Sequence, residues 1–446
     1  MLLSTPAYFA FLAVIFVGFW LADRFRAAGL AVILFANMFF YAKWGWIYLA
    51  IIPVAASCDF LVGRQLDRSS HMLFRRALLT ASLVLNIGLI ASVKYLPLSL
   101  SFYAFQSLTY TIDVYRRDAS ATPDYLAYLS SASFFPTTLA GPITRLPGLV
   151  SQMRKDRLVD TRAGGQALFL IGLGLIKKLL IADYLGEHLV NRVFDLPKLY
   201  SGTEVLLAVY GYAFQLYADF SGYTDIALGS ALLLGIRLPA NFRRPYAAQN
   251  IADFWRRWHI TLSNWLRDYV YFSLPGLRSR WKIFTYLNLI LTMAVGGLWH
   301  GMAWNFLIWG LLHGVGLAVV RWGQVLRGNQ GPSQAGAARV LRILGTFHFV
   351  ALGWIFFRAA NLATARDILV QVGSMTVSFA NISGGFCVVL AVAAAFHFVP
   401  DEWYQRCQDV FVGSPFYVQA AAMTLLVVAI QYVAVTGSAP FIYTRF

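Results

Sequence analysis

The sequence is dominated by apolar runs that are long enough to cross a lipid bilayer. A membrane-spanning helix needs about 20 apolar residues, because its length must match the thickness of the hydrocarbon layer. Such runs recur along the chain at 6–22, 27–62, 77–97, 166–185, 203–236, 283–299, 302–321, 341–357, 384–400 and 416–435. A soluble protein can bury one such run, but this number of runs predicts a polytopic membrane protein.

The predicted fold class is all-α, with a single integral membrane domain covering residues 1–446. At about 20 residues for each span, roughly 10–12 spanning helices form the bundle, and the run 27–62 supplies two of them. Only 13% of the residues are charged, against roughly 25% in soluble domains. The runs lack the two-residue alternation of lipid-facing strands, which argues against a transmembrane barrel.

The net charge of +16 does not indicate a nucleic-acid partner, because the basic residues sit in short breaks between apolar runs. Examples are "DRFR" at 23–26, "YRRD" at 115–118 and "FRRP" at 242–245. Loops rich in Lys and Arg usually face the cytoplasm. The first run then enters from the other side, so we expect an extracytoplasmic N-terminus and a chain surrounded by the lipid bilayer.

The sequence offers no recognisable metal or nucleotide site. Its three cysteines, Cys58, Cys387 and Cys407, are scattered and lack metal-ligand spacing. The P-loop and H-E-x-x-H motifs are missing, as is the G-x-S-x-G signature of serine nucleophiles. We therefore predict no metal site and no permanently bound cofactor.

Two segments are unusual for a membrane protein. Residues 129–153 are moderately apolar but are broken by Pro136, Gly141, Pro142 and Pro147. A straight spanning helix is disfavoured there, and a re-entrant segment that lines a cavity is the prediction.

The second segment, 241–276, has the period of an amphipathic helix on the cytoplasmic side. Asn250 is a suitable N-cap, and apolar residues follow at 251, 254, 255, 258, 262, 265, 266 and 269. Arg256 and Arg257 belong to the opposite, polar face. This pattern favours a helix lying against the cytoplasmic leaflet.

Three histidines interrupt apolar sequence. His259 lies on the apolar stripe of the second segment, where a histidine is more often a packing residue. His300 follows a Gly-Gly pair and Trp299, precedes Gly301, and lies at the end of a spanning run. An ionisable group at such depth indicates a functional site. His313 would face about 220° away on one straight helix, so a structural role is predicted for it.

Polar residues also interrupt "QLYADFSGYTDIALG" at 215–229, which includes Asp219 and Asp225. Either a hydrogen-bonding network between helices or a cavity wall explains them. The pair Lys177–Lys178 is interpreted as the end of a helix near the inner surface.

Taken in order, several stretches resemble the membrane-bound O-acyltransferase (MBOAT) family in its bacterial alginate O-acetylation (AlgI-type) branch. The stretches are "LPLSLSFYAFQSLTYTIDVYR" (96–116), "FFPTTLAGPITR" (134–145), "GLIKKLLIADYL" (174–185), "YAFQLYADFSGYTDIALGSALLLGIRLPANFRRPY" (212–246), "IADFWRRWHITLSNWLRDYVYFSLPG" (251–276) and "GGLWHGMAWNFLIWGLLHG" (296–314).

The resemblance implies a catalytic pair. His300 matches the embedded histidine of the W-H-G motif and would activate an acceptor hydroxyl. His259 matches a second polar residue about forty positions earlier and would orient or hydrogen-bond a reacting group. Arg256 and Arg257 would lie on the side of the donor, where phosphates or anionic lipids are equally good partners.

The resemblance also implies a central tunnel in which a cytoplasmic thioester donor, acetyl-CoA or another acyl thioester, meets an acceptor from the other side. It places the chain in the bacterial cytoplasmic (inner) membrane. The implied partners are a periplasmic acetyltransferase of the SGNH type and a polysaccharide biosynthesis complex.

Acetyl transfer is the predicted activity. D-alanyl transfer to teichoic acid, a non-catalytic transporter or export component, and a scaffold for a polysaccharide synthase stay open.

Overall fold

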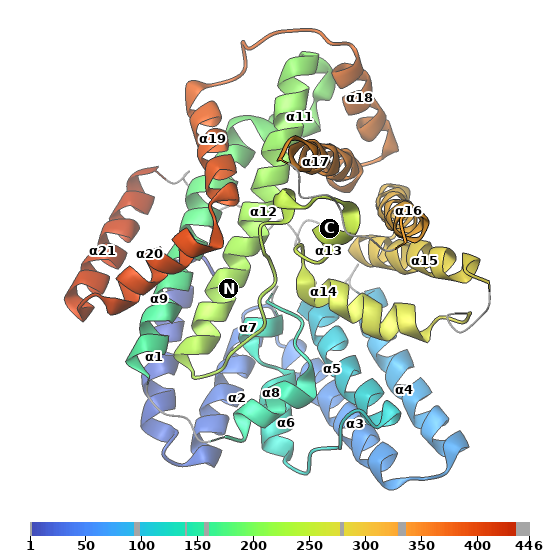
Figure 1. Ribbon diagram of the computed structural model, residues 1–446. Helices are drawn as coiled ribbons and strands as arrows, with labels where there is room; N and C mark the ends of the chain where they lie inside the picture. The colour runs from blue at the N-terminus through green and yellow to red at the C-terminus, as the bar shows by residue number, and fades with distance from the viewer. Residues whose placement is uncertain are drawn as a thin grey trace.

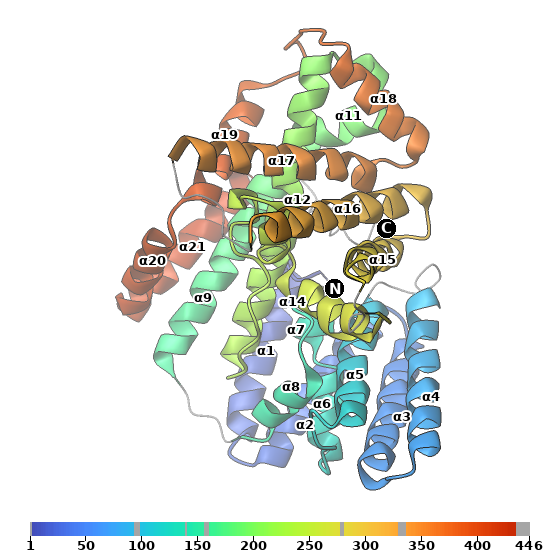
Figure 2. The same cartoon turned by 45° about the vertical axis from the view of Figure 1, so that its right-hand side comes forward.

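The computed structural model describes residues 2–92, 99–138, 141–155, 160–276, 281–328 and 336–433, and every regular element in these ranges is helical. Each predicted apolar run contains one or more helices among its described residues. In Figures 1 and 2, the N-terminal helices gather at one end of the molecule and α12 (Gly202–Leu233) runs through its centre.

The N-terminal helices pack around a buried polar core. They are α1 (Pro6–Ala22), α2 (Arg26–Ala42), α3 (Tyr48–Arg68), α4 (Met72–Ala91) and α5 (Ser99–Arg116). The run 27–62 forms the hairpin of α2 and α3, as predicted. Asp59 of α3 is fully buried and accepts hydrogen bonds from Ser82 and Asn86 of α4 and from Ser107 of α5. These bonds join three helices and satisfy a carboxyl group that would be costly to bury alone.

The segment 129–153 forms no straight helix. It holds the end of α6 (Tyr125–Ala132), the single turn α7 (Phe135–Thr138) and α8 (Leu146–Met153), while residues 139–140 lie outside the described part. Asn37 of α2 anchors it by donating to the Ser130 carbonyl at 3.1 Å and accepting from the Phe135 amide at 3.0 Å. Its predicted re-entrant position in the bilayer stays a prediction.

A π-helix takes part in the contacts between the next helices and α12. The chain continues without a break through α9 (Thr161–Leu175), the π-helix η2 (Ile176–Ala182), α10 (Asp183–Leu185), the π-helix η3 (Gly186–Val190) and α11 (Asn191–Asp195). Within η2, Lys177 lies 2.6 Å from Asp225, and Lys178 lies 2.8 Å from Asp183 and 2.6 Å from Asp219.

These ion pairs correct the interpretation of Lys177 and Lys178 as a helix end. Lys178 is 1% exposed, because both lysines belong to the middle of a helical stretch and turn towards α12. The polar residues Asp219 and Asp225 therefore form a network between helices, which was one of the two explanations considered.

The amphipathic segment is interrupted, and this contradicts the prediction of one helix. It forms α13 (Ile251–Trp255), α14 (Ile260–Trp265), the π-helix η6 (Leu266–Val270) and the 3₁₀ turn η7 (Tyr271–Ser273). Asn250 caps α13 by accepting from the Asp253 amide, as predicted. Each of the eight predicted apolar positions is buried. The stripe was correctly identified, but its periodicity did not reveal the break.

Two helices, α15 (Ile283–His300) and α16 (Trp304–Leu326), approach each other closely. Glycines permit this contact, because a Cβ on Gly310 would lie 2.4 Å from the Met293 carbonyl oxygen and one on Gly297 would lie 2.3 Å from that of Phe306. The remaining helices are α17 (Gly336–Arg358), α18 (Leu362–Gly373), α19 (Gly384–Phe398), α20 (Asp401–Gly413) and α21 (Phe416–Val433).

Fewer helices than predicted meet the requirements for a membrane span. In the described ranges five are long and apolar enough, namely α3, α4, α15, α16 and α17. A sixth results if α19 and α20, bent by 95°, count as one span, and α1, α2 and α21 are shorter apolar helices. The prediction of 10–12 spans counted apolar runs, whereas the run at 166–185 contains a π-helix and α12 carries buried carboxyl groups.

Candidate active site

His259 lies at the interruption between α13 and α14 and adopts an unusual backbone conformation. Its φ of 40° is in the left-handed region, which a residue with a Cβ enters only at a cost of about 1–2 kcal/mol. Two backbone bonds hold this turn, from Ile260 N–H to the Asn241 carbonyl and from Arg243 N–H to the Arg257 carbonyl, both 2.9 Å. The conformation turns the imidazole into the protein, where it is 1% exposed.

Asn241 binds the His259 imidazole from the preceding loop. Its Oδ1 lies 3.1 Å from Nδ1 of His259 and accepts hydrogen bonds from the amide and the hydroxyl of Thr261, at 3.2 and 2.9 Å. On its other side, His259 meets Phe220 edge-to-face at 4.7 Å. The ring is therefore fixed by a hydrogen bond and by packing.

His300 is the last residue of α15. Its imidazole is 6% exposed and has edge-to-face contacts with Trp309 at 5.2 Å and Phe357 at 4.9 Å. Gly301 has no side chain that would strike the Phe306 ring, since a Cβ there would lie 2.4 Å from it. Helix α15 can therefore end at His300, and the chain can turn back to begin α16.

The two histidines lie in each other's vicinity. Burial lowers the pKa of His259 well below its ordinary value, and the proximity of His300 lowers it further. Side chains around the two histidines are also in contact: Trp255, in the helix before His259, meets Trp309, which contacts His300, at 5.8 Å. His259 is thus expected to be the neutral imidazole near neutral pH, the form that can accept a proton.

His313 belongs to the same aromatic region, contrary to its predicted separation from His300. That separation assumed one straight helix, whereas residues 301–303 reverse the chain between α15 and α16. Trp309 contacts both imidazoles, His300 at 5.2 Å and His313 at 5.0 Å. Neither ring nitrogen of His313 has a hydrogen-bond partner among the described residues.

A cavity of about 470 Å³ lies beside this region. Its walls combine α5, the loop before α8, α8 itself, residues 237–239, α14 and η6, and they include Arg145, Arg237, Thr261, Trp265 and Asp268. Arg145 is paired with Asp268. The Arg237 backbone forms two hydrogen bonds with the Gln152 side chain, at 2.9 and 3.0 Å, while its side chain stays exposed.

The inner wall of the cavity leads to both histidines. Thr261 lines the cavity and binds Asn241, which in turn binds His259. Trp265 lines it as well and donates to the Phe105 carbonyl at 3.1 Å. The Phe105 ring contacts Trp299, the neighbour of His300, at 5.2 Å. Two chains of contacting side chains thus run from the cavity lining to the imidazoles.

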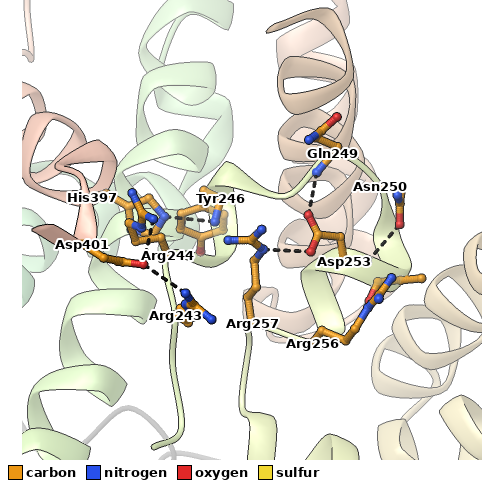
Figure 3. A network of polar contacts seen from close by, with 11 residues as sticks. Arg243, Arg244, Tyr246, Gln249, Asn250, Asp253, Arg256, Arg257, His397 and Asp401 are labelled. Carbon is orange, nitrogen blue, oxygen red and sulfur yellow. Dashed lines mark hydrogen bonds and ion pairs between the residues drawn. The ribbon is translucent and has the colours of Figure 1, made fainter. Parts of the chain in front are cut away.

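Arg256 and Arg257 lie outside the cavity lining. Figure 3 shows Arg257 directed at Asp253, with the two groups 2.8 Å apart. Arg256 is exposed, and its Nε donates to the Ala252 carbonyl. In the same view, Asp401 pairs with Arg243 and Arg244 at 3.2 and 3.0 Å. The donor-side role of Arg256 and Arg257 stays a prediction.

The sequence pattern did not indicate a role for Asn241, Thr261, Arg145 or Arg237. In the stretch "LPANFRRP" at 238–245, Asn241 stands between the apolar residues Ala240 and Phe242, and this was the one available signal for it. Within the described ranges, no group of three or more His, Cys, Asp or Glu side chains is arranged to hold a metal ion.

Comparisons with known proteins agree with this architecture. The profile of the MBOAT, membrane-bound O-acyltransferase family matches residues 26–363. A peptidoglycan O-acetyltransferase of Helicobacter pylori is 33% identical over 437 residues, covering 86% of this chain and 82% of that protein. A probable alginate O-acetylase AlgI of Azotobacter vinelandii is 36% identical over 393 residues, covering 82% and 76%. A teichoic acid D-alanyltransferase of Bacillus subtilis is 32% identical over 240 residues, covering 50% and 59%.

A multi-pass helical membrane protein with these relatives is an acyltransferase. More narrowly, the chain belongs to the membrane-bound O-acyltransferase family, and its relatives include alginate and peptidoglycan O-acetylating proteins.

Proposed function

We propose that the protein transfers an acetyl group from a cytoplasmic thioester donor to an acceptor hydroxyl, at a site formed by His259 and His300. The observation that carries the proposal is the burial of two neighbouring imidazoles behind the inner wall of a cavity that arginines border. Histidine suits this reaction because its neutral form accepts a proton near working pH.

The donor enters through the cavity in this proposal. Arg237 has an exposed guanidinium at the cavity, and the described residues offer it no ion-pair partner, so it suits a donor phosphate. The basic breaks of the sequence support a cytoplasmic location for this side. Arg256 and Arg257 remain candidates for the approach of the donor or of anionic lipids along the same side.

In the proposed acyl transfer, the two imidazoles have different roles. The hydroxyl oxygen forms a bond to the acyl carbon while the carbon–sulfur bond breaks. One imidazole accepts the hydroxyl proton, which then passes to the departing thiolate, and the other hydrogen-bonds the acyl group. Burial excludes water that would otherwise hydrolyse the thioester.

The acceptor in this proposal is an extracytoplasmic polysaccharide or a periplasmic acetyltransferase of the SGNH type that passes the acetyl group to it. The names of the relatives support polymer acetylation, since one refers to alginate and another to peptidoglycan. The proposed location is the bacterial inner membrane, with the N-terminus outside the cytoplasm.

The test is acetyl transfer by the full chain in proteoliposomes with radiolabelled acetyl-CoA and an added polymer or relay protein. His300→Ala should lower transfer by about 10²–10⁴-fold, the usual contribution of a positioned acid–base group. His348→Ala, which removes an exposed histidine of α17, is the matched control and should retain the wild-type rate. Full transfer by His300→Ala at equal protein level would refute the proposed site. Polymer translocation without labelling would favour an export component instead.

A further inference from the structure

The connecting loop between α12 and α13, residues 234–250, carries two groups of the proposed site. Arg237, near its beginning, lines the cavity and has an exposed side chain. Asn241, in the same loop, binds the His259 imidazole at 3.1 Å. One segment of chain therefore borders the cavity and also fixes the ring of a buried histidine, so a displacement of this loop would disturb both.

The later part of the connecting loop is bound by a break in the C-terminal helices. Helix α19 ends at Phe398, α20 begins at Asp401, and the two helices are bent by 95°. Pro400 cannot continue α19 because it has no N–H, so carbonyls at the end of α19 need partners outside the helix. The Val399 carbonyl accepts a hydrogen bond from the Arg244 guanidinium at 3.1 Å.

His397, in the last turn of α19, binds the backbone of the connecting loop. Its Nε2 lies 3.0 Å from the backbone nitrogen of Tyr246, whose hydrogen it accepts. His397 is 3% exposed and packs edge-to-face against Tyr217 of α12 at 4.6 Å. The Tyr246 hydroxyl donates to the Ala213 carbonyl of α12 at 2.7 Å. Together these contacts fix the loop against the central helix.

Asp401 adds two ion pairs at the beginning of α20. Figure 3 shows it joined to Arg243 at 3.2 Å and to Arg244 at 3.0 Å. Partly exposed pairs of this kind contribute little stability by themselves. With the Val399 carbonyl, however, Asp401 fixes the direction of the Arg244 guanidinium.

The backbone of Arg244 is strained, which indicates that these contacts constrain the connecting loop. Its φ of 45° lies in the left-handed region, although Pro245 follows and a residue before proline prefers an extended conformation. A residue other than glycine persists in this region only where its surroundings enforce it. Here the bonds to Val399 and Asp401 hold the side chain, so the break between α19 and α20 determines the course of the loop.

We propose that His397 and Asp401, at the break between α19 and α20, are positioning residues for the acyl transfer. They act through the connecting loop, by keeping Arg237 at the cavity and Asn241 against His259. The inference rests on the proposed function and extends its site into helices that follow residue 363, where the match to the family profile ends.

The first measurement reads the anchoring of the loop independently of activity. Hydrogen–deuterium exchange of the full chain in lipid nanodiscs, followed by mass spectrometry, compares the wild type with His397→Leu and His397→Gln. His397→Leu should speed exchange of the connecting loop about tenfold, because the Tyr246 N–H loses its buried acceptor. His397→Gln should keep exchange slow, since its amide oxygen can accept in place of Nε2. Equal exchange in all three proteins would contradict the anchoring.

The second measurement reads the consequence for transfer from acetyl-CoA. His397→Leu should raise the KM for acetyl-CoA and lower kcat, because Arg237 and Asn241 are displaced together. The expected loss in kcat/KM is about tenfold, which corresponds to one buried hydrogen bond. Asp401→Ala should act in the same direction by a smaller factor. His397→Gln should keep most of the wild-type value, and an equal loss in His397→Gln and His397→Leu would contradict the role of the acceptor.

Arg244→Gly separates the contacts of this side chain from its backbone strain. Glycine adopts a φ of 45° readily, so the variant keeps the left-handed turn and loses the bonds to Val399 and Asp401. It should lower kcat/KM, and adding Asp401→Ala to it should have little further effect, because the two changes remove one interaction. Fully additive effects would show that Asp401 does not act through Arg244.

Ser383→Ala is the matched control for a general loosening of α19. It removes the N-cap at the other end of the same helix, where Ser383 accepts the Phe386 N–H at 3.1 Å. The variant should lower the melting temperature but leave loop exchange, kcat and KM at wild-type values. A loss of transfer as large as that of His397→Leu would assign the effect to general stability and refute the positioning role.

The outcomes separate this inference from the proposed function. Faster loop exchange in His397→Leu with wild-type kcat and KM would overturn the positioning role while acyl transfer stands. No transfer by the wild type would overturn acyl transfer and, with it, the positioning role, even where the exchange data show an anchored loop. Faster exchange together with the loss in kcat/KM, both prevented in His397→Gln, would support the inference.

Discussion

A phosphorylated donor can approach through the cavity or along the exposed side of α13, and a single arginine marks each route. Arg237 lines the cavity, whereas Arg256 lies on the exposed side of α13, outside the lining. A hydrogen bond to a charged group contributes about 1.5–3 kcal/mol. We therefore expect Arg237→Glu to raise the KM for acetyl-CoA by about tenfold or more, and Arg256→Glu to leave it near the wild-type value.

Initial rates over a range of acetyl-CoA concentrations test this pair of variants. Both replace an exposed arginine by glutamate, so general effects of charge are matched. An increase in KM confined to Arg256→Glu would return the donor to the polar face of Arg256 and Arg257, the side that the family resemblance implied.

The environment of His259 also predicts a pH dependence. Burial and the nearby His300 lower its pKa below the usual value for histidine, about 6.5. The proton-accepting form therefore persists to lower pH than a free imidazole would allow. Transfer should stay constant from neutral pH down through about 6.5 and decline only below it. A pH–rate profile with half-maximal activity above that value would contradict this environment.

At the residue scale, the sequence identified the histidines but not the group that orients one of them. His300 was conspicuous because glycines flank it at the end of an apolar run, and His259 was matched through the family motif. Asn241 lies in a loop 18 residues before His259, outside the amphipathic stripe, and its partner Thr261 follows the break. Only the folded chain brings these groups together, and the catalytic roles themselves stay predictions.

At the scale of helices, glycines determine how closely α15 and α16 approach. Because the backbone of α15 lies within 2.4 Å of the position of a Cβ on Gly310, any side chain there must push the helices apart. Overpacking of this kind costs about 1–3 kcal/mol or more. Gly310→Leu should lower the thermal stability of the detergent-solubilised protein and displace Trp309 from His300.

Gly345→Leu is the matched control for this prediction. It makes the same replacement in α17, at an exposed position where no atom lies within 4 Å of the added Cβ. Thermal unfolding followed by size-exclusion chromatography compares the two variants. Equal melting temperatures would show that the contact between α15 and α16 adapts to a side chain.

The positions of helices were easier to predict than their interruptions. An apolar run shows where a helix must lie, because each run has to avoid water. The break at His259 left the stripe from Ile251 to Tyr269 intact, since every stripe residue is buried on both sides of it. The periodicity of apolar residues indicates which side chains are buried. It does not reveal a local turn that leaves the same side chains buried.

At the scale of the whole molecule, buried ion pairs join the central helix α12 to the stretch containing η2. Lys178 lies against both Asp183 and Asp219 and is 1% exposed. Removing one partner of a buried pair costs about 3–5 kcal/mol, because the other charge stays buried. Lys178→Met should therefore greatly reduce folded yield and melting temperature.

Lys198→Met is the corresponding surface variant. Lys198 pairs with Asp367 at 3.1 Å, but its side chain is 69% exposed, and such pairs contribute about 0–1 kcal/mol. Folded yield of each variant, measured by fluorescence-detected chromatography in detergent, gives the comparison. Similar yields for both would mean that the pairs of Lys178 contribute little to the fold.

The π-helix η2 makes the fold sensitive to chain length at one place. A π turn behaves like an α-helix with one inserted residue, and each residue adds about 100° of rotation around the axis. Deleting one residue between Ile176 and Ala182 would rotate everything on one side of the deletion by that angle. Lys177 and Lys178 could then no longer reach Asp225 and Asp219 together. A homologue aligned with a one-residue gap here would need a different arrangement of charges along its central helix.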